Sequence, residues 1–176
     1  MKTSIRLFAL LMVLMGFGVR AYAQSTAFAS TTVVLITPIG ITKTAEMHFG
    51  TVAASGTPGT IILEYNSTTA IGTGGATIVS AGAAQPTTAQ FKVTGLVGDT
   101  FSIQLPTEDL ILTGTTDGMK AGSFKASIDG TNDVTTGTIA EGGTTISVKG
   151  ILTVPANAVA GSYANANQLI VKVNYN

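Results

Sequence analysis

The chain has 176 residues, of which only 10% are charged and none is cysteine. Globular proteins ordinarily carry about a quarter charged residues, so Gly, Ala, Ser and Thr must form much of the surface here. Nine basic residues balance nine acidic ones, which argues against nucleic acid or an anionic membrane as a partner. Such a surface suits a protein that packs against copies of itself or against other surface and matrix components.

The first 23 residues predict a secretory signal peptide. A basic start precedes an apolar run over residues 7–19, and Ala21 and Ala23 are the small residues expected before a cleavage site. The run falls short of the roughly 20 residues that span a bilayer. We therefore expect cleavage after Ala23 and an exported protein, periplasmic, on the outer surface or extracellular, that does not span the membrane. Removing 23 of the 176 residues leaves 153, which we expect to form one domain, 24–176.

Short runs of alternating apolar and polar residues, separated by Gly and Pro, predict strands along the rest of the chain. No segment after residue 23 repeats apolar residues at helical spacing over three turns. The pattern therefore predicts an all-β protein, an antiparallel β-sandwich. Strands are expected at residues 32–36, 39–41, 47–52, 61–65, 77–79, 91–94, 100–105, 110–112, 124–128, 145–154 and 169–175.

The last of these runs is the most regular. Leu169, Val171, Val173 and Tyr175 fall on one face of an extended chain, and Lys172 and other polar residues fall on the opposite face. Burial of such a face contributes about 1.5 to 3 kcal/mol per side chain. We therefore expect this strand to line the core.

Gly, Pro and Asp mark the expected connections between strands. The loop 95–99, with Gly at both ends, predicts a hairpin between 91–94 and 100–105. Gly150 interrupts the longest run, which indicates a bulge or a close approach of another segment. Turns are expected at Gly56–Gly59, Asp117–Gly118 and Asp129–Gly130.

Residues suited to catalysis or metal binding are few. His48 is the sole histidine, so neither a histidine pair for a metal nor a proton relay can form. The pattern G-x-S-x-G is absent, and Glu108 and Asp109 are adjacent, so their carboxylates point apart in an extended chain. The turn at 129–133 lacks the spacing of a calcium loop. We predict no catalytic residue, no cofactor-binding residue, no metal ligand and no enzymatic activity.

One further motif is Asn66-Ser67-Thr68, which matches the N-glycosylation pattern. The pattern has meaning only in a eukaryotic secretory route, and nothing else in the chain indicates one.

Three parts of the sequence resemble a family of small exported bacterial proteins, the domain of unknown function DUF4402. The family is frequent in bacteria with two membranes, and the resemblance implies no established activity. The parts are residues 37–52 with Phe49-Gly50, residues 89–95 followed by 100–106, and residues 150–157 followed by Gly161-Ser162-Tyr163 and 171–176.

The element Gly161-Ser162-Tyr163 and the alternating last strand also look like the C-terminus of pilins and spore-coat-type proteins, a resemblance that implies an immunoglobulin-like (pilin-like) form of the sandwich. In chaperone-assembled pilins, an N-terminal extension of one subunit completes the sheet of the next. Here the segment 24–32 has few large apolar side chains. We therefore expect a sandwich that is complete in itself.

The leading functional hypothesis is an exported, non-enzymatic structural or adhesive protein of the cell surface, for which a pilin-like subunit is one form. The alternative is an extracellular module that binds glycans or another ligand, which would need an exposed aromatic platform. The only candidates for that platform are Tyr65, Tyr163 and Phe49, and all three are expected in the core.

Overall fold

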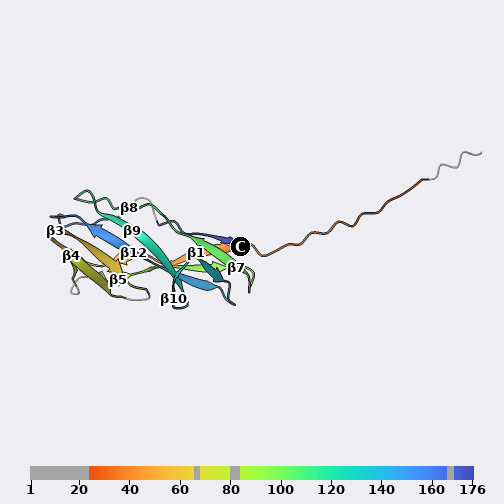
Figure 1. The fold of residues 1–176 in the computed structure, drawn as a ribbon, viewed down its shortest axis with the longest axis horizontal. Coiled ribbons are helices and arrows are strands. Elements are labelled where there is room, and N and C mark those ends of the chain that lie inside the picture. Colours follow the sequence, from red (N-terminus) through yellow and green to blue (C-terminus); the bar gives the residue numbers. More distant parts are fainter. Residues whose placement is uncertain (1–23, 66–67, 80–83, 166–168) are drawn as a thin grey trace, which may run out of the picture. The chain divides into compact units, whose positions relative to one another are not determined.

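A computed structural model describes residues 24–65, 68–79, 84–165 and 169–176 (Figure 1). The predicted signal peptide, residues 1–23, lies outside the described residues. The chain divides into one unit that ends at Leu35 and a second, compact unit, Ile36–Asn176. Residues 24–39 have no regular secondary structure, and residues 24–38 are exposed.

The regular structure of the described residues consists of strands (Figure 1). No part of these residues forms a helix with the length and apolar character needed to cross a membrane. The strands are β1 (Gly40–Ala45), β2 (His48–Phe49), β3 (Val52–Leu63), β4 (Ala70–Ile78), β5 (Pro86–Thr87), β6 (Ala89–Thr94), β7 (Thr100–Gln104), β8 (Leu110–Ile111), β9 (Lys120–Ile128), β10 (Thr131–Val134), β11 (Thr136–Thr138), β12 (Thr144–Val154) and β13 (Lys172–Tyr175).

Strand β12 is the centre of the largest sheet. Its residues 144–148 pair with β6 and its residues 151–154 with β3, so two strands share one of its edges. Strand β9 occupies the other edge, and β8 and β10 both pair with β9. The full order is β1-β6-β12-β3-β4 with β9 beside β12; smaller sheets have the orders β11-β7-β13 and β2-β5. All pairs are antiparallel.

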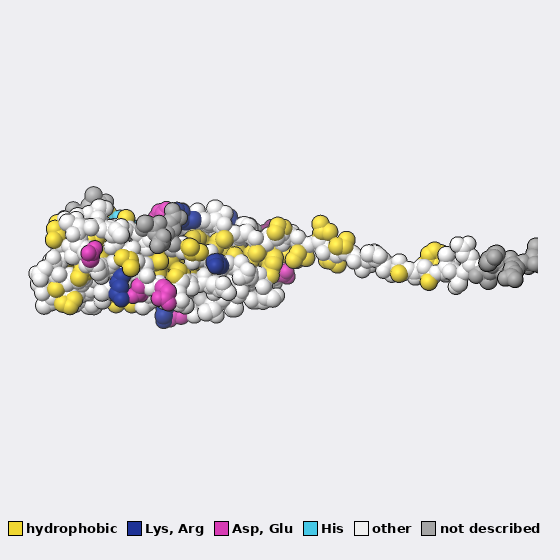
Figure 2. Space-filling model, turned by 90° about the horizontal axis from the view of Figure 1, so that it is seen from above, with side chains coloured by type: hydrophobic (Ala, Val, Ile, Leu, Met, Phe, Trp, Pro, Cys, Tyr) yellow, Lys and Arg dark blue, Asp and Glu magenta, His cyan; other side chains and the backbone are white. Residues whose placement is uncertain are grey.

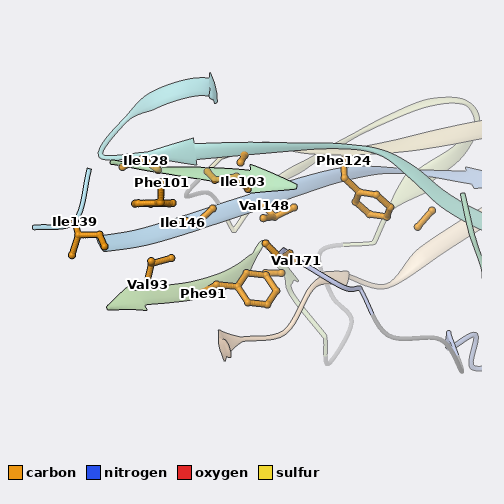
Figure 3. Packing of buried hydrophobic residues seen from close by; sticks show 13 residues of the cluster. Phe91, Val93, Phe101, Ile103, Phe124, Ile128, Ile139, Ile146, Val148 and Val171 are labelled. Carbon is orange, nitrogen blue, oxygen red and sulfur yellow. The ribbon is translucent and has the colours of Figure 1, made fainter. Parts of the chain in front are cut away.

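The main core lies between the largest sheet and the three-stranded sheet (Figure 3). Phe101 and Ile103 of β7 are buried in one cluster with Val93, Ile146 and Val148 of β6 and β12. Burial of apolar side chains between two antiparallel sheets is the defining feature of a β-sandwich. The predicted all-β, antiparallel sandwich is therefore confirmed.

Two of the longer predicted strands have the expected faces. In β9, Phe124, Ala126 and Ile128 are buried. In β12, the pairing with β9 shifts register between Lys149 and Ile151, and a Cβ at Gly150 would lie 2.9 Å from the ring of Phe124. The bulge and the close approach predicted at this glycine are both confirmed.

Three local predictions are wrong. The run 32–36 is exposed and forms no strand. The strands 91–94 and 100–105 do not form a hairpin, because β6 and β7 belong to different sheets and the loop 95–99 crosses between them. The segment Gly56–Gly59 does not turn but lies inside β3, where the register against β4 shifts between Ala54 and Gly59. Gly and Pro mark a bulge there, which alternation alone does not distinguish from a turn.

The C-terminal strand has the predicted faces but is shorter and less buried than expected. Val171 is buried, while Leu169, Val173 and Tyr175 are half-buried against the same core. The Tyr175 hydroxyl accepts a hydrogen bond from the Leu96 amide and donates one to the Thr37 carbonyl, each at 2.8 Å. It thus joins the loop 95–99, the C-terminus and the segment before β1.

Candidate functional site

A groove of about 1090 Å³, with both apolar and polar groups on its walls, lies over part of the largest sheet. A second buried cluster, which includes Ile61, Met119 and Leu152, packs beside it. No member of that cluster belongs to the three-stranded sheet, so the smaller sheet covers only part of the larger one. The groove is lined by side chains that include Met47, Phe91, Leu112, Phe124, Val154 and Leu169.

Charge is scarce in this groove. Of its lining residues, Lys43 and Glu46 are charged and form an ion pair with each other. The surface as a whole is also poor in charge, as Figure 2 shows for one face of the molecule. A concavity with mixed walls, whose charges are already paired, is suited to a ligand or polypeptide segment with apolar and neutral polar groups, and less to a strongly charged ligand.

Two of the described strands have an edge without a partner, and one of them, β1, contributes a residue to the groove. Within the described residues, β1 pairs only with β6, and β13 pairs only with β7. Lys43 of β1 and Leu169, which lies shortly before β13, both line the groove. Unpaired edges of this kind offer backbone amides and carbonyls to another extended segment.

Asn165 adds an unsatisfied polar group to the same groove. Its side-chain nitrogen and oxygen are both buried and have no hydrogen-bond partner among the described residues. A carboxamide is at once a donor and an acceptor, and buried polar atoms are nearly always paired in folded proteins.

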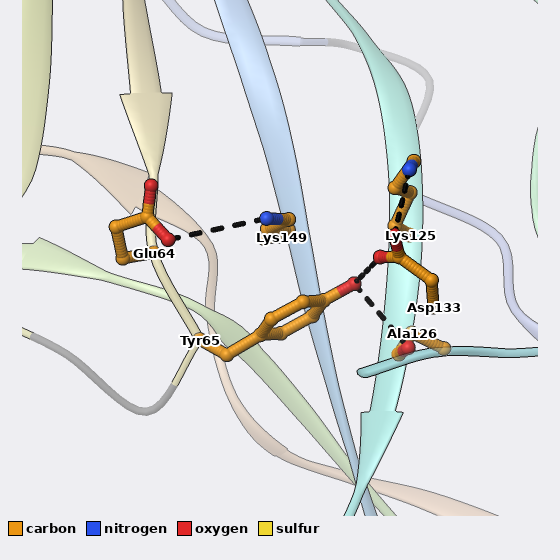
Figure 4. A network of polar contacts seen from close by, with 6 residues as sticks. All are labelled: Glu64, Tyr65, Lys125, Ala126, Asp133 and Lys149. Carbon is orange, nitrogen blue, oxygen red and sulfur yellow. Dashed lines mark hydrogen bonds and ion pairs between the residues drawn. The ribbon is translucent and has the colours of Figure 1, made fainter. Parts of the chain in front are cut away.

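The most perturbed ionisable groups lie elsewhere, in a polar network between β3, β9, β10 and β12 (Figure 4). The Tyr65 hydroxyl donates a hydrogen bond to Asp133 Oδ1 at 2.8 Å and lies 3.3 Å from the carbonyl oxygen of Ala126. Lys125 Nζ lies 2.8 Å from Asp133 Oδ2. Lys149 Nζ lies 4.3 Å from the centre of the Tyr65 ring.

This network holds strands together and is not suited to proton transfer. Burial, followed by the hydrogen bond to Asp133, raises the pKa of Tyr65 well above its usual range. The hydrogen bond from Lys125, followed by that from Tyr65, lowers the pKa of the Asp133 carboxyl. Both shifts move the groups away from neutral pH, where a general acid or base would need to titrate.

Of the sequence candidates for catalysis, His48 lines the groove, and Glu108 and Asp109 are not part of its lining. His48 is exposed, and its Nδ1 accepts a hydrogen bond from the Gly50 amide at 2.9 Å. Asp109 forms an ion pair with Lys120 at 2.7 Å. The geometry thus assigns both candidates to local structure.

The candidate calcium turn is a hairpin connection. Asp129 and Gly130 have positive φ angles of 48° and 82° and join β9 to β10, as the type I′ turn of a two-residue hairpin requires. Asp133 already binds Lys125 and Tyr65. In the described part of the chain, no group of three or more His, Asp or Glu could hold a metal. The glycosylation motif includes Asn66 and Ser67, which lie outside the described residues.

The aromatic candidates separate into two places. Phe49 and Tyr163 line the groove, and the Tyr163 hydroxyl donates a hydrogen bond to the Val159 carbonyl at 2.6 Å. Tyr65 belongs to the polar network instead. All three are half-buried, so they lie at the edge of the core rather than within it, and they do not form one platform.

Sequence reasoning missed the groove. One signal for it was the segment 158–164, which is rich in Ala and Gly, has no strand pattern and contributes all seven of its residues to the lining. Small side chains of this kind cannot fill the space over a sheet.

Comparison with known proteins places this fold in a family. No curated protein and no solved structure matches the chain. The family model described as Domain of unknown function (DUF4402) matches residues 39–175, which include the thirteen strands of the described residues and every residue that lines the groove. The chain therefore belongs to the DUF4402 family.

Proposed function

We propose that the protein is an exported, non-enzymatic structural or adhesive protein of the cell surface that works as a pilin-like building unit. The observation that carries the proposal is the charge-poor sandwich, whose strands β1 and β13 each have a partner on one edge only within the described residues. Unpaired strand edges on a charge-poor surface favour association with other polypeptides through backbone hydrogen bonds and apolar contacts.

The disposition of the polar side chains supports a structural role. The ionisable groups with resolved pKa shifts, Tyr65 and Asp133, join strands to one another. The lone histidine, His48, lines the groove, but its Nδ1 accepts a hydrogen bond from the Gly50 amide, and Tyr65 and Asp133 are not part of the lining. An enzyme would need such groups to converge on one cleft.

Fractionation of cells that express the full chain tests the proposal. We expect the protein in the surface or extracellular fraction, shortened by the length of the predicted signal peptide, and accessible to protease added to intact cells. A deletion strain should lose attachment or matrix formation and regain it with the intact gene. Full-length protein in the cytoplasm, or a deletion strain with unchanged attachment, would overturn the proposal.

A further inference from the structure

The floor of the groove is formed by side chains of the core. Phe91 of β6 and Phe124 of β9, both labelled in Figure 3, line it, as do Leu152 and Val154 of β12. Protein interiors ordinarily leave few voids larger than a water molecule, whereas this space measures about 1090 Å³. That volume is close to the upper end of the range for small-molecule sites, about 300 to 1,000 Å³. A ligand that covers this floor removes its own apolar surface from water, which favours binding.

The groove is long in the direction of β12. Phe91 pairs with Ile146 of β12, and Val154 lies eight residues further along the same strand. At about 3.3 Å per residue, the lining positions Phe91 and Val154 are about 26 Å apart along the sheet. Eight of the residues that line the groove are alanines, whose small side chains leave this length open. The shape therefore favours an elongated ligand.

The walls of the groove favour a ligand without charge. Lys43 and Glu46, the charged lining residues, form an ion pair with each other. A carboxylate, phosphate or ammonium group in the groove would lose water without gaining a charged partner, which is costly. The remaining polar side chains of the lining are neutral, for example Thr51 and Ser162. A neutral oligosaccharide fits less well, because each of its many hydroxyl groups needs a partner and the floor is apolar.

His48 supplies a hydrogen-bond donor at the rim of the groove. Its Nδ1 accepts a hydrogen bond from the Gly50 amide at 2.9 Å. A ring nitrogen that accepts carries no proton, so the proton of this neutral imidazole is on Nε2. His48 is exposed and lines the groove. Its Nε2 can therefore donate to an ester carbonyl or a hydroxyl oxygen of a ligand.

We propose that the groove binds an uncharged amphiphile, a molecule with one long aliphatic chain and a neutral oxygen-bearing head, such as a monoacylglycerol. The chain lies over the floor that contains Phe91 and Phe124, and the head accepts a hydrogen bond from His48 Nε2. Met47 and Met119 also line the groove, and their flexible side chains adapt to chains of different shape. This binding activity goes beyond the proposed structural role and does not depend on it.

A tryptophan placed in the groove tests for occupancy. The chain has no Trp, so Ala164→Trp, at an exposed lining position, gives a fluorescence signal from one site. We expect 1-monolauroylglycerol, kept below its critical micelle concentration, to shift this emission to shorter wavelength in a saturable titration of the purified full chain. Val97→Trp is the matched control, since Val97 is exposed and not part of the lining, and its emission should not change.

Two further ligands test the chemical class. Laurate has the same chain with a charged head and should bind about tenfold more weakly or worse, because its carboxylate has no charged partner in the groove. Maltohexaose is neutral but has no aliphatic chain, and it should cause no shift. Melting temperatures equal to that of the parent establish that the variants are folded; if Ala164→Trp is not, Ala54→Trp at the same groove replaces it.

Two substitutions of His48 separate the contact with the head group from the bond to Gly50. In His48→Asn, the amide oxygen lies near the place of Nδ1 and can keep the bond to Gly50, but nothing replaces Nε2. In His48→Gln, the amide nitrogen lies near the place of Nε2. Made in the Ala164→Trp chain, His48→Asn should weaken monolauroylglycerol binding about threefold to tenfold, the effect of one hydrogen bond. His48→Gln should bind nearly as well as the parent.

Three results would overturn the inference. The first is an emission shift of equal size in Val97→Trp, which would mean adsorption over the whole surface. The second is a saturable shift with maltohexaose and none with monolauroylglycerol, which would make the groove an oligosaccharide site. The third is equal affinity for laurate and monolauroylglycerol together with equal affinity in His48→Asn and His48→Gln, which would remove any role for a neutral head.

Discussion

Tyr175→Phe is the most informative single change in this domain, because it removes one oxygen atom and leaves the ring in place. That oxygen accepts from the Leu96 amide and donates to the Thr37 carbonyl, each at 2.8 Å. A hydrogen bond contributes about 0.5 to 1.5 kcal/mol net, so the loss of both should cost about 1 to 3 kcal/mol. At about 2 to 4 °C per kcal/mol for a domain of this size, the melting temperature should fall by about 2 to 12 °C.

Thermal unfolding followed by circular dichroism measures this change. Tyr163→Phe is the graded control, since the Tyr163 hydroxyl makes one hydrogen bond, to the Val159 carbonyl, and it should cost about half as much. Lys172→Ala, at an exposed position of β13, should change stability by less than about 0.5 kcal/mol. If Tyr175→Phe melts within 1 °C of the parent, where ~1 kcal/mol would shift it by ~2 °C or more, the hydroxyl does not hold these segments together.

Four further predictions concern the polar network, the core and metal binding. Lys125 lowers the pKa of the exposed Asp133 carboxyl. The carboxylate therefore stabilises the fold at pH values above its pKa in the unfolded chain, and this contribution is lost as the pH falls through its pKa in the folded protein. In Asp133→Asn, the free energy of unfolding measured in urea should depend less on pH across that acidic range. The pKa of Tyr65 is raised, so the pH dependence runs the other way. The contribution of Tyr65 to stability is present below its pKa in the unfolded chain and is lost as the pH rises through its pKa in the folded protein. Tyr65→Phe should therefore lose less free energy of unfolding at alkaline pH than the parent in the same assay. Gly150→Ala should cost about 1 to 3 kcal/mol by overpacking against Phe124, and an unchanged melting temperature would contradict the close packing. EDTA should leave the melting temperature unchanged, and a fall of about 5 °C, equivalent to about 1.3 to 2.5 kcal/mol for a domain of this size, would revive the calcium hypothesis.

The fold class was predictable because alternation reports directly on which face is buried. In β9 and β12, Phe124, Ala126, Ile146 and Val148 are buried as their spacing predicts. The close packing at Gly150 was also predictable, because a glycine in the middle of an apolar run indicates that another segment approaches the backbone closely. These signals are local, and each depends on a few adjacent residues.

Pairing between strands was not predictable in the same way. The runs 91–94 and 100–105 alternate equally well as a hairpin or as strands of two facing sheets, since both arrangements bury Phe91 and Phe101. A loop of five residues permits either one. The choice depends on distant partners: β12 for the first strand and β13 for the second.

The groove and the exposed run illustrate a related limit. A run such as Val33 to Ile36 has the composition of a buried strand, and sequence alone predicts that it belongs to its own sheet. The structure leaves it exposed. Composition reports that a segment prefers burial, but not which surface will bury it, and the groove became visible only with the packing of residues 158–164 over the sheet.

The shared edge of β12 has a consequence for the order in which the protein folds. Thr144 pairs with Val93, and Val154 pairs with Gly59. Strands β3 and β6 are therefore synthesised well before β12, the strand with which they pair. Closure of such long loops costs entropy before any contact offsets it, which slows folding. Until β12 arrives, β3, β6 and β9 each have an open edge on the side where it will pair. If the chain crosses a membrane unfolded, the strands that form before residue 144 emerges have these edges exposed to other chains. A chaperone that covers exposed strand edges would therefore prevent aggregation most effectively during that interval.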